Sequence, residues 1–97
     1  MTQAKALTRE PTTIEEHRVA GLRAAMTAHE VRLQRQALAE RLRSGDDPEI
    51  RLQIAYCDYM TYDFDSALDN GKAAFLGFRR AGHKRRAAVA AAAVGRI

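Results

Sequence analysis

Apolar residues recur at every third or fourth position along most of the chain, which is the spacing of amphipathic α-helices. Residues 14–43 contain no proline and carry two such stripes. Either Thr13 with Glu16 or Thr12 with Glu15 supplies a capping box for the start of this helix. We expect one long helix that contacts two neighbours; the alternative is a break near residues 27–30 that folds the segment into a hairpin. One stripe consists of Val31, Leu38 and Leu42, and the other of Val19, Leu22, Met26, Leu33 and Ala37.

The segment 44–48 marks the end of one helix and the start of the next. Gly45 is expected to form the left-handed turn after the first helix, an aspartate caps the second, and Pro48 takes its first position. The second helix, residues 48–61, has two apolar faces. One face consists of Ile50, Ile54, Cys57 and Thr61, and the adjacent face of Leu52, Ala55, Tyr56 and Tyr59.

A third helix is expected after a tight corner at Tyr62 and Asp63, with Asp63 or Asp65 as its cap. Gly71 in its interior costs about 1 kcal/mol relative to alanine, so we expect a neighbouring helix to approach closely there. Gly82 ends this helix, and a fourth runs from residues 83–85 to the end of the chain. The apolar face of the third helix is Phe64, Ala67, Leu68, Gly71, Phe75 and Phe78, and that of the fourth is Ala90, Ala93, Val94 and Ile97.

These elements predict an all-α fold of about four helices, in a single domain over residues 13–97 after a flexible segment 1–12. The composition agrees, because tryptophan is absent and aromatic residues make up only 6% of the 97 positions. The single cysteine, Cys57, excludes an internal disulfide. We find no pattern typical of a signal peptide, and the alanine-rich run near the C-terminus is too short to span a bilayer. We therefore expect a cytoplasmic protein.

The second and third predicted helices resemble a tetratricopeptide repeat, in which two antiparallel helices are held together by small and large residues at fixed positions. Ile54 and Ala55 match the large–small pair of the first helix. Residues 63–68 match the acidic–aromatic–acidic run, with alanine and an aliphatic residue after it, that opens the second helix, and residues 74–75 match its later small position. Val94 and Gly95 repeat the first pair forty residues later.

This forty-residue spacing is similar to that of the helical-repeat sensor regions of bacterial LuxR/MalT-type transcription regulators. Asp58 and Gly71 depart from the pattern, because they stand where the repeat usually carries aromatic residues. The resemblance implies a regulatory protein–protein interaction module. Each repeat buries its apolar face against the next one, and Val94 and Ile97 have no successor here. We therefore expect either a longer protein or a second chain over this edge, as in a homodimer or another homo-oligomer.

The sequence gives little support for a catalytic or a metal-binding site. The candidate metal ligands His17, His29, His83 and Cys57 do not lie three to five residues apart, so no metal site is expected. An acid-rich corner surrounds the connection between the second and third predicted helices. Most of its carboxylates can cap a helix or lie in solvent, and no nucleophile–base pair accompanies them. We expect no enzyme activity and no cofactor. This corner consists of Tyr56, Asp58, Tyr59, Tyr62, Asp63, Asp65 and Asp69.

Charge is unevenly distributed along the chain. The net charge is +4, yet residues 46–70 carry −6 and residues 71–97 carry +7. A basic block at the connection between the third and fourth predicted helices could contact phosphates. DNA or RNA binding is therefore the alternative function. The alanine-rich helix that follows offers almost no base-reading side chains, and it lacks the bulky apolar face of a membrane-surface helix. The basic block consists of Arg79, Arg80, Lys84, Arg85 and Arg86.

The function expected from the sequence is binding, through the exposed face of the predicted repeat. The partner is another protein, a peptide or a second copy of the chain. The acidic corner adds electrostatic selection, and the basic block suits an acidic partner. The residues expected to contact the partner are Arg51, Leu52, Tyr56, Tyr59, Val94 and Ile97.

Overall fold

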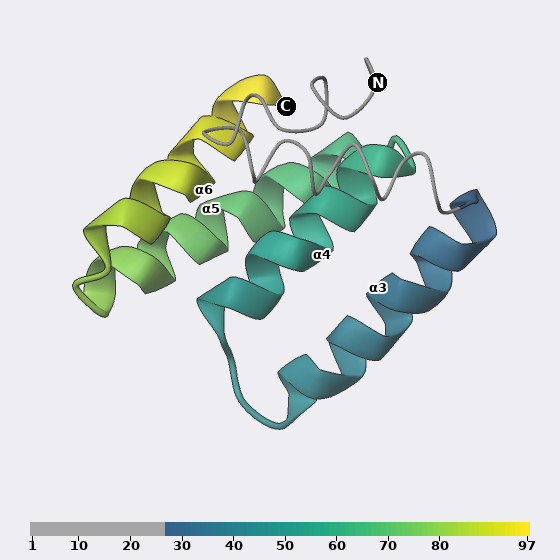
Figure 1. Ribbon diagram of the computed structural model, residues 1–97, viewed down its shortest axis with the longest axis horizontal. Coiled ribbons are helices and arrows are strands. Elements are labelled where there is room, and N and C mark those ends of the chain that lie inside the picture. Colours follow the sequence, from purple (N-terminus) through teal and green to yellow (C-terminus); the bar gives the residue numbers. More distant parts are fainter. Residues whose placement is uncertain (1–26) are drawn as a thin grey trace, which may run out of the picture.

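The computed structural model describes residues 27–97, which form four α-helices and no strand. These are α3 (Ala28–Arg43), α4 (Pro48–Met60), α5 (Phe64–Arg80) and α6 (Lys84–Arg96). Each helix packs mainly against its neighbour in the chain, and short connections make successive helices antiparallel (Figure 1). The predicted all-α class is confirmed for this part of the chain. The flexible segment 1–12 and the capping boxes at residues 12–16 lie outside the described residues.

The helix that ends at Arg43 begins after Thr27. The backbone of Thr27 is extended, with φ −76° and ψ 168°. Its hydroxyl accepts a hydrogen bond from the Glu30 amide at 3.2 Å, and its own amide donates to the Glu30 carboxylate at 2.8 Å. This capping box places the start of α3 at Ala28, which agrees with the break at residues 27–30; the hairpin that this alternative predicted extends outside the described residues. Residues 14–26 lie outside the described range.

The connection between α3 and α4 follows the predicted order but not the predicted turn. Asp47 accepts a hydrogen bond from the Glu49 amide at 2.8 Å, and Pro48 occupies the first helical turn, as expected. Gly45, however, does not adopt a positive φ. The amides of Ser44 and Gly45 instead bond to the carbonyls three residues earlier, at 3.1 Å each, so α3 ends in a tightened right-handed turn.

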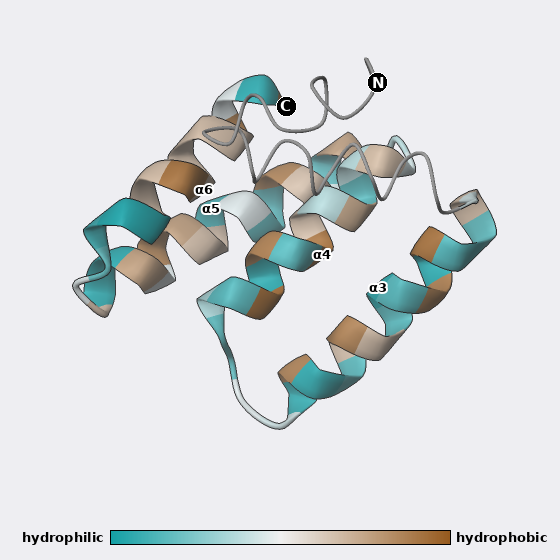
Figure 2. Cartoon of the chain, in the orientation of Figure 1, coloured by the Kyte–Doolittle hydropathy of each residue, from teal (hydrophilic) through white to brown (hydrophobic). Residues whose placement is uncertain are grey.

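Helix α4 lies between two apolar clusters, which its two predicted faces supply. The face with Ile50, Ile54 and Cys57 packs on α3, and the face with Leu52 packs on α5 and α6. Figure 2 shows that these helices carry both apolar and polar positions, as expected of amphipathic helices. The first cluster is completed by Val31, Leu38, Leu42 and Met60, and the second by Tyr56, Ala74, Phe75, Phe78, Ala87, Val89, Ala90 and Ala93.

Two glycines allow α5 to approach both of its neighbours closely. A Cβ atom at Gly71 would lie 2.9 Å from Val94 Cγ2 of α6, and one at Gly77 would lie 2.9 Å from Pro48 Cβ of α4. Real Cβ atoms essentially never approach another atom this closely. The expectation of a close helix contact at Gly71 is therefore confirmed, and the contact lies between α5 and α6.

The helices repeat with a period of 36 residues. α3 and α5 begin at Ala28 and Phe64, and α4 and α6 begin at Pro48 and Lys84, in both cases 36 residues apart. Ile54 then corresponds to Ala90, and the two are similarly buried, at 2% and 0% exposure. The period is shorter than the forty residues taken from the two large–small pairs, because Val94 lies four positions beyond the counterpart of Ile54.

The two turns that flank α5 have the same backbone shape. Asp63 N bonds to Asp58 O at 2.8 Å, and His83 N bonds to Phe78 O at 2.9 Å. Each turn places one residue in the left-handed region: Gly82 has φ 77°, and Tyr62 has φ 66°. Glycine is the usual residue at this position of a helix C-terminus, so Tyr62 is the exception.

Candidate functional site

The predicted partner-binding residues divide into a buried and a surface group. Leu52 is fully buried between α4, α5 and α6, so a partner cannot reach it. The sequence placed Leu52 on an apolar face of this helix, but it did not show that α5 and α6 cover that face completely at Leu52. Arg51, Tyr56 and Tyr59 are half-buried and remain part of the surface of α4.

Val94 and Ile97 are also half-buried. Val94 packs against Gly71 of the neighbouring helix. Its side chain therefore contributes to the fold, and only its remaining exposed part is available to a partner.

A buried carboxylate, Asp58, joins three helices. Its side chain is 2% exposed and accepts hydrogen bonds from Arg35 Nε at 2.5 Å and from the Ser66 hydroxyl at 2.6 Å. Longer contacts come from Arg35 Nη2 at 3.5 Å and from Asn70 Nδ2 at 3.4 Å. Since a buried carboxylate needs a counter-charge and several donors, this cluster fixes α3, α4 and α5 relative to one another.

The cluster continues to the surface through Arg51. Asn70 Oδ1 accepts from Arg51 Nη1 at 3.2 Å, and Arg51 Nε donates to Asp46 Oδ1 at 2.9 Å. The hydrogen bond from Arg51 lowers the pKa of Asp46. The hydrogen bond to Asp58 raises the pKa of Arg35 despite partial burial of the guanidinium. The arrangement holds side chains in place and leaves none of the buried polar side-chain atoms of residues 27–97 without a hydrogen bond.

Our interpretation of Asp58 as part of a solvated acidic corner was wrong, because it is 1% exposed. The sequence did contain a signal for the buried pair. Asp58 follows Ile54 by four positions, and Arg35 lies between Val31 and Leu38 at helical spacing, so both charges interrupt apolar stripes. Two opposite charges at such positions indicate a paired buried contact.

The basic block consists of two kinds of residue. Arg86 donates to both carboxylate oxygens of Glu49, at 3.1 and 2.6 Å, and lies over the Phe78 ring at 5.7 Å. It therefore ties α6 to α4. Arg79 lies over the Phe75 ring at 5.6 Å but is exposed, as are Arg80, Lys84 and Arg85.

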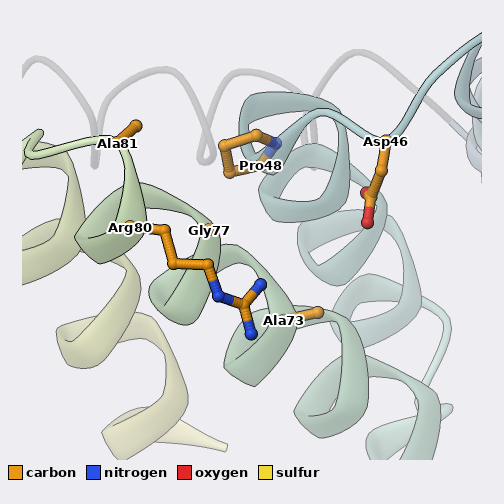
Figure 3. Close-up of a pocket in the computed structure, with 6 residues that line it drawn as sticks. All are labelled: Asp46, Pro48, Ala73, Gly77, Arg80 and Ala81. Carbon is orange, nitrogen blue, oxygen red and sulfur yellow. The ribbon is translucent and has the colours of Figure 1, made fainter.

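An open groove of about 390 Å³ lies over the contact between the start of α4 and the end of α5. Its floor is formed by small residues, because Gly77 lies directly against Pro48. Figure 3 shows the guanidinium of Arg80 extended toward Ala73, while the carboxylate of Asp46 points to the same space from the opposite side. The groove thus offers one cation and one carboxylate above an apolar floor.

Aromatic side chains gather at the turn between α4 and α5. Phe64 was predicted to lie in the core, but it is 45% exposed, because the buried arc of α5 is centred on Ala67, Ala74 and Phe78. Its ring instead contacts those of Tyr59, at 5.6 Å between centroids, and Tyr62, at 6.1 Å. Tyr62 is 80% exposed. These rings form an exposed aromatic surface beside Asp63 and Asp65.

Residues 27–97 hold no group of three histidine, cysteine or carboxylate side chains that could bind a metal ion, and none of their helices is long and apolar enough to cross a membrane. His17 lies outside this range. Comparison of the chain with protein-family models, with curated proteins and with solved structures gives no match in any of the three. What the described residues define is an all-α array of stacked antiparallel helices.

Proposed function

We propose that the chain is a non-enzymatic protein–protein interaction module of tetratricopeptide-like type, which associates with a second copy of itself or binds a helical or peptide partner. Its role is regulatory, and it is either the sensor region of a transcription regulator or a small stand-alone adaptor. The observation that carries this proposal is the 36-residue repeat of helices that pack in chain order. Such arrays present continuous outer surfaces for partners.

The composition of the outer surface supports a binding role. Large apolar side chains are exposed on three elements: Leu33 on α3, Tyr62 in the turn before α5, and Leu76 on α5. Tyrosine, phenylalanine and arginine are enriched at protein interfaces, and Tyr56 and Tyr59 remain partly accessible on α4. The charge difference between residues 46–70 and 71–97 adds an electrostatic term that selects oppositely charged partners.

Sedimentation velocity of the purified chain, from low to high micromolar concentration, tests this function. We expect the weight-average mass to rise with concentration and the helical circular dichroism to stay constant. A chain that stays monomeric throughout and binds random DNA duplex would overturn the proposal. A variant that tests association should leave Val94 unchanged, because Val94 packs on Gly71 and a substitution there would damage the fold.

Nucleic-acid binding is a second candidate, favoured by the exposure of Lys84 and Arg85, which make no ion pair with the described residues. These residues lie in the first turn of α6, where the helix dipole disfavours cations and favours a bound anion. Fluorescence anisotropy with a labelled duplex tests this candidate. Binding that falls steeply with salt and is lost in Lys84→Glu with Arg85→Glu would support it.

A further inference from the structure

The exposed face of α5 carries charges in a polarised order. Asp65, Lys72 and Arg79 are spaced seven residues apart, so they lie on one line along the helix, and all three are exposed. Asp69 adds a second exposed carboxylate near the start of the helix, and Arg80 a second exposed cation at its end. The face is therefore negative at one end and positive at the other.

Apolar side chains accompany this line. Phe64 and Leu76 are each 45% exposed, and Leu68 and Phe75 are half-buried. At 100° per residue, these four side chains fall on the same half of α5 as the charged line, opposite the buried residues Ala67, Ala74 and Phe78. Phe75 packs at the edge of the second cluster and Phe64 contacts Tyr59 of α4, while the charged line and Leu76 between them remain exposed.

The two ends of this face cannot meet within one molecule. They lie at opposite ends of the 17-residue helix, about 25 Å apart at the α-helical rise, and Figure 1 shows the α4–α5 and α5–α6 turns at opposite ends of α5. A second copy of the chain carries the complementary charge for each end. An antiparallel copy of the same helix reverses the order of the charges, so that each negative end meets a positive end.

We propose that two copies of the chain associate through this face of α5, antiparallel and related by a twofold axis near Lys72. This inference rests on the proposed function and names its partner. In the dimer Asp65 of each copy lies near Arg79 of the other, because the two positions are equidistant from residue 72. The aromatic surface at Tyr62 and Phe64 receives the partner's Arg79 and Arg80 through cation–π contacts.

The backbone at Tyr62 agrees with this role. A tyrosine with φ 66° is strained, whereas the matching turn after α5 uses Gly82. The fold alone would be served better by glycine at position 62. An exposed aromatic side chain at a strained position is expected where the ring contacts a partner.

The position of Lys72 at the twofold axis provides a specific test of the dimer. Two copies of this residue approach each other near the twofold axis, and their like charges oppose association. Lys72→Gln removes this repulsion without adding apolar surface, so it is expected to tighten the dimer several-fold. Removal of a lysine elsewhere, as in Lys84→Gln, leaves the affinity unchanged.

The closing experiment exchanges the charges between copies. Asp65→Lys and Arg79→Glu are each expected to weaken the dimer about tenfold, because both inter-chain pairs become repulsive. In an equimolar mixture, each heterodimer contains two restored pairs, so the affinity returns to within a few-fold of the parent. Sedimentation velocity measures the masses, and circular dichroism confirms that each variant is folded. Tyr62→Gly serves as a second variant, because it is expected to weaken the dimer while it stabilises the monomer.

The outcomes separate this inference from the proposed function. A parent chain that dimerises with the same affinity as both charge variants would overturn the α5 interface and leave the interaction module standing. Oligomers that grow beyond two copies would also overturn it, since a twofold contact closes at the dimer. A parent that stays monomeric would overturn self-association altogether. Loss of duplex binding in Arg79→Glu, with no dimer in the parent, would favour the nucleic-acid candidate in its place.

Discussion

Val94 occupies the space in which a side chain at Gly71 would begin, since a Cβ atom there would lie 2.9 Å from Val94 Cγ2. Thirty-six residues earlier the same two positions of the repeat are held by Arg35 and Asp58, whose Nε and Oδ1 atoms are 2.5 Å apart. The α3–α4 and α5–α6 contacts of the array therefore use the same positions with different chemistry. One contact is a close apolar approach, and the other is a buried ion pair.

Gly71→Ala is expected to lower the free energy of unfolding by about 1 kcal/mol. Alanine favours the helix by about 1 kcal/mol. The added methyl group, however, collides with Val94, and overpacking of a tight contact costs about 1–3 kcal/mol. Urea denaturation followed by circular dichroism measures the difference.

Gly95→Ala is the matched control, because Gly95 lies in α6 and has no other atom within 4 Å of the added Cβ. This variant is expected to be as stable as the parent or slightly more stable. Val94→Ala should suppress the effect of Gly71→Ala in the double variant, since it removes the colliding methyl group. A Gly71→Ala chain that is more stable than the parent would contradict the close approach.

Asp58→Asn is expected to destabilise the fold by roughly 3 kcal/mol. The substitution keeps the shape but removes the charge that Arg35 and Ser66 satisfy, and it places amide hydrogens against donors. Asp65→Asn is the control, because Asp65 is exposed and the change should stay within about 0.5 kcal/mol. Equal effects of the two substitutions would show that Asp58 is not the centre of the cluster.

The sequence predicted the helices of residues 48–97 well, because each boundary has its own local signal. Asp47 and Pro48 mark one start, and Asp63 and Gly82 mark the limits of α5. The spacing of apolar residues also predicted that α4 has two packed faces. Local signals of this kind depend only on neighbouring residues, so they can be recognised without knowledge of tertiary contacts.

Features set by tertiary contacts were harder to predict. Leu52 and Tyr56 belong to the same predicted face, yet Leu52 is 0% exposed and Tyr56 is half-buried, because Leu52 lies inside the second cluster and Tyr56 packs at its edge. Asp58 was assigned to solvent because its partners Arg35 and Asn70 are 23 and 12 residues away. Pairing over such distances in the sequence depends on the register between helices, which periodicity alone does not determine.

Tyr62→Gly and Gly82→Ala are expected to change stability in opposite directions. The two residues occupy equivalent left-handed positions, with φ 66° and 77°. Glycine relieves strain at position 62 and should stabilise the fold by roughly 0.5–1 kcal/mol, after the loss of the Tyr62–Phe64 ring contact. Alanine at position 82 should cost about 1–2 kcal/mol. Thermal denaturation of the two variants checks both signs, and a destabilised Tyr62→Gly chain would mean that the tyrosine ring supports the fold.

Cys57 should make the stability of the chain fall at alkaline pH. Burial raises the pKa of its thiol to about 11, with a smaller effect from the nearby Asp58 carboxylate. In the unfolded chain the thiol has a pKa of about 8.5. Because the folded state holds the proton more tightly, its contribution is fully present below about pH 8.5. The contribution is lost as the pH rises toward 11, with a total of roughly 3 kcal/mol.

Urea denaturation of the parent and of Cys57→Ala between pH 8 and 11 isolates this contribution. All other ionisable groups are the same in both chains, so the difference between the two curves belongs to the thiol. The parent should lose more stability than Cys57→Ala across this interval. Since Cys57 is 4% exposed, a thiol reagent at neutral pH should label the folded parent only as fast as the chain opens. Rapid labelling of the folded chain, or parallel stability curves, would contradict a buried thiol at this position.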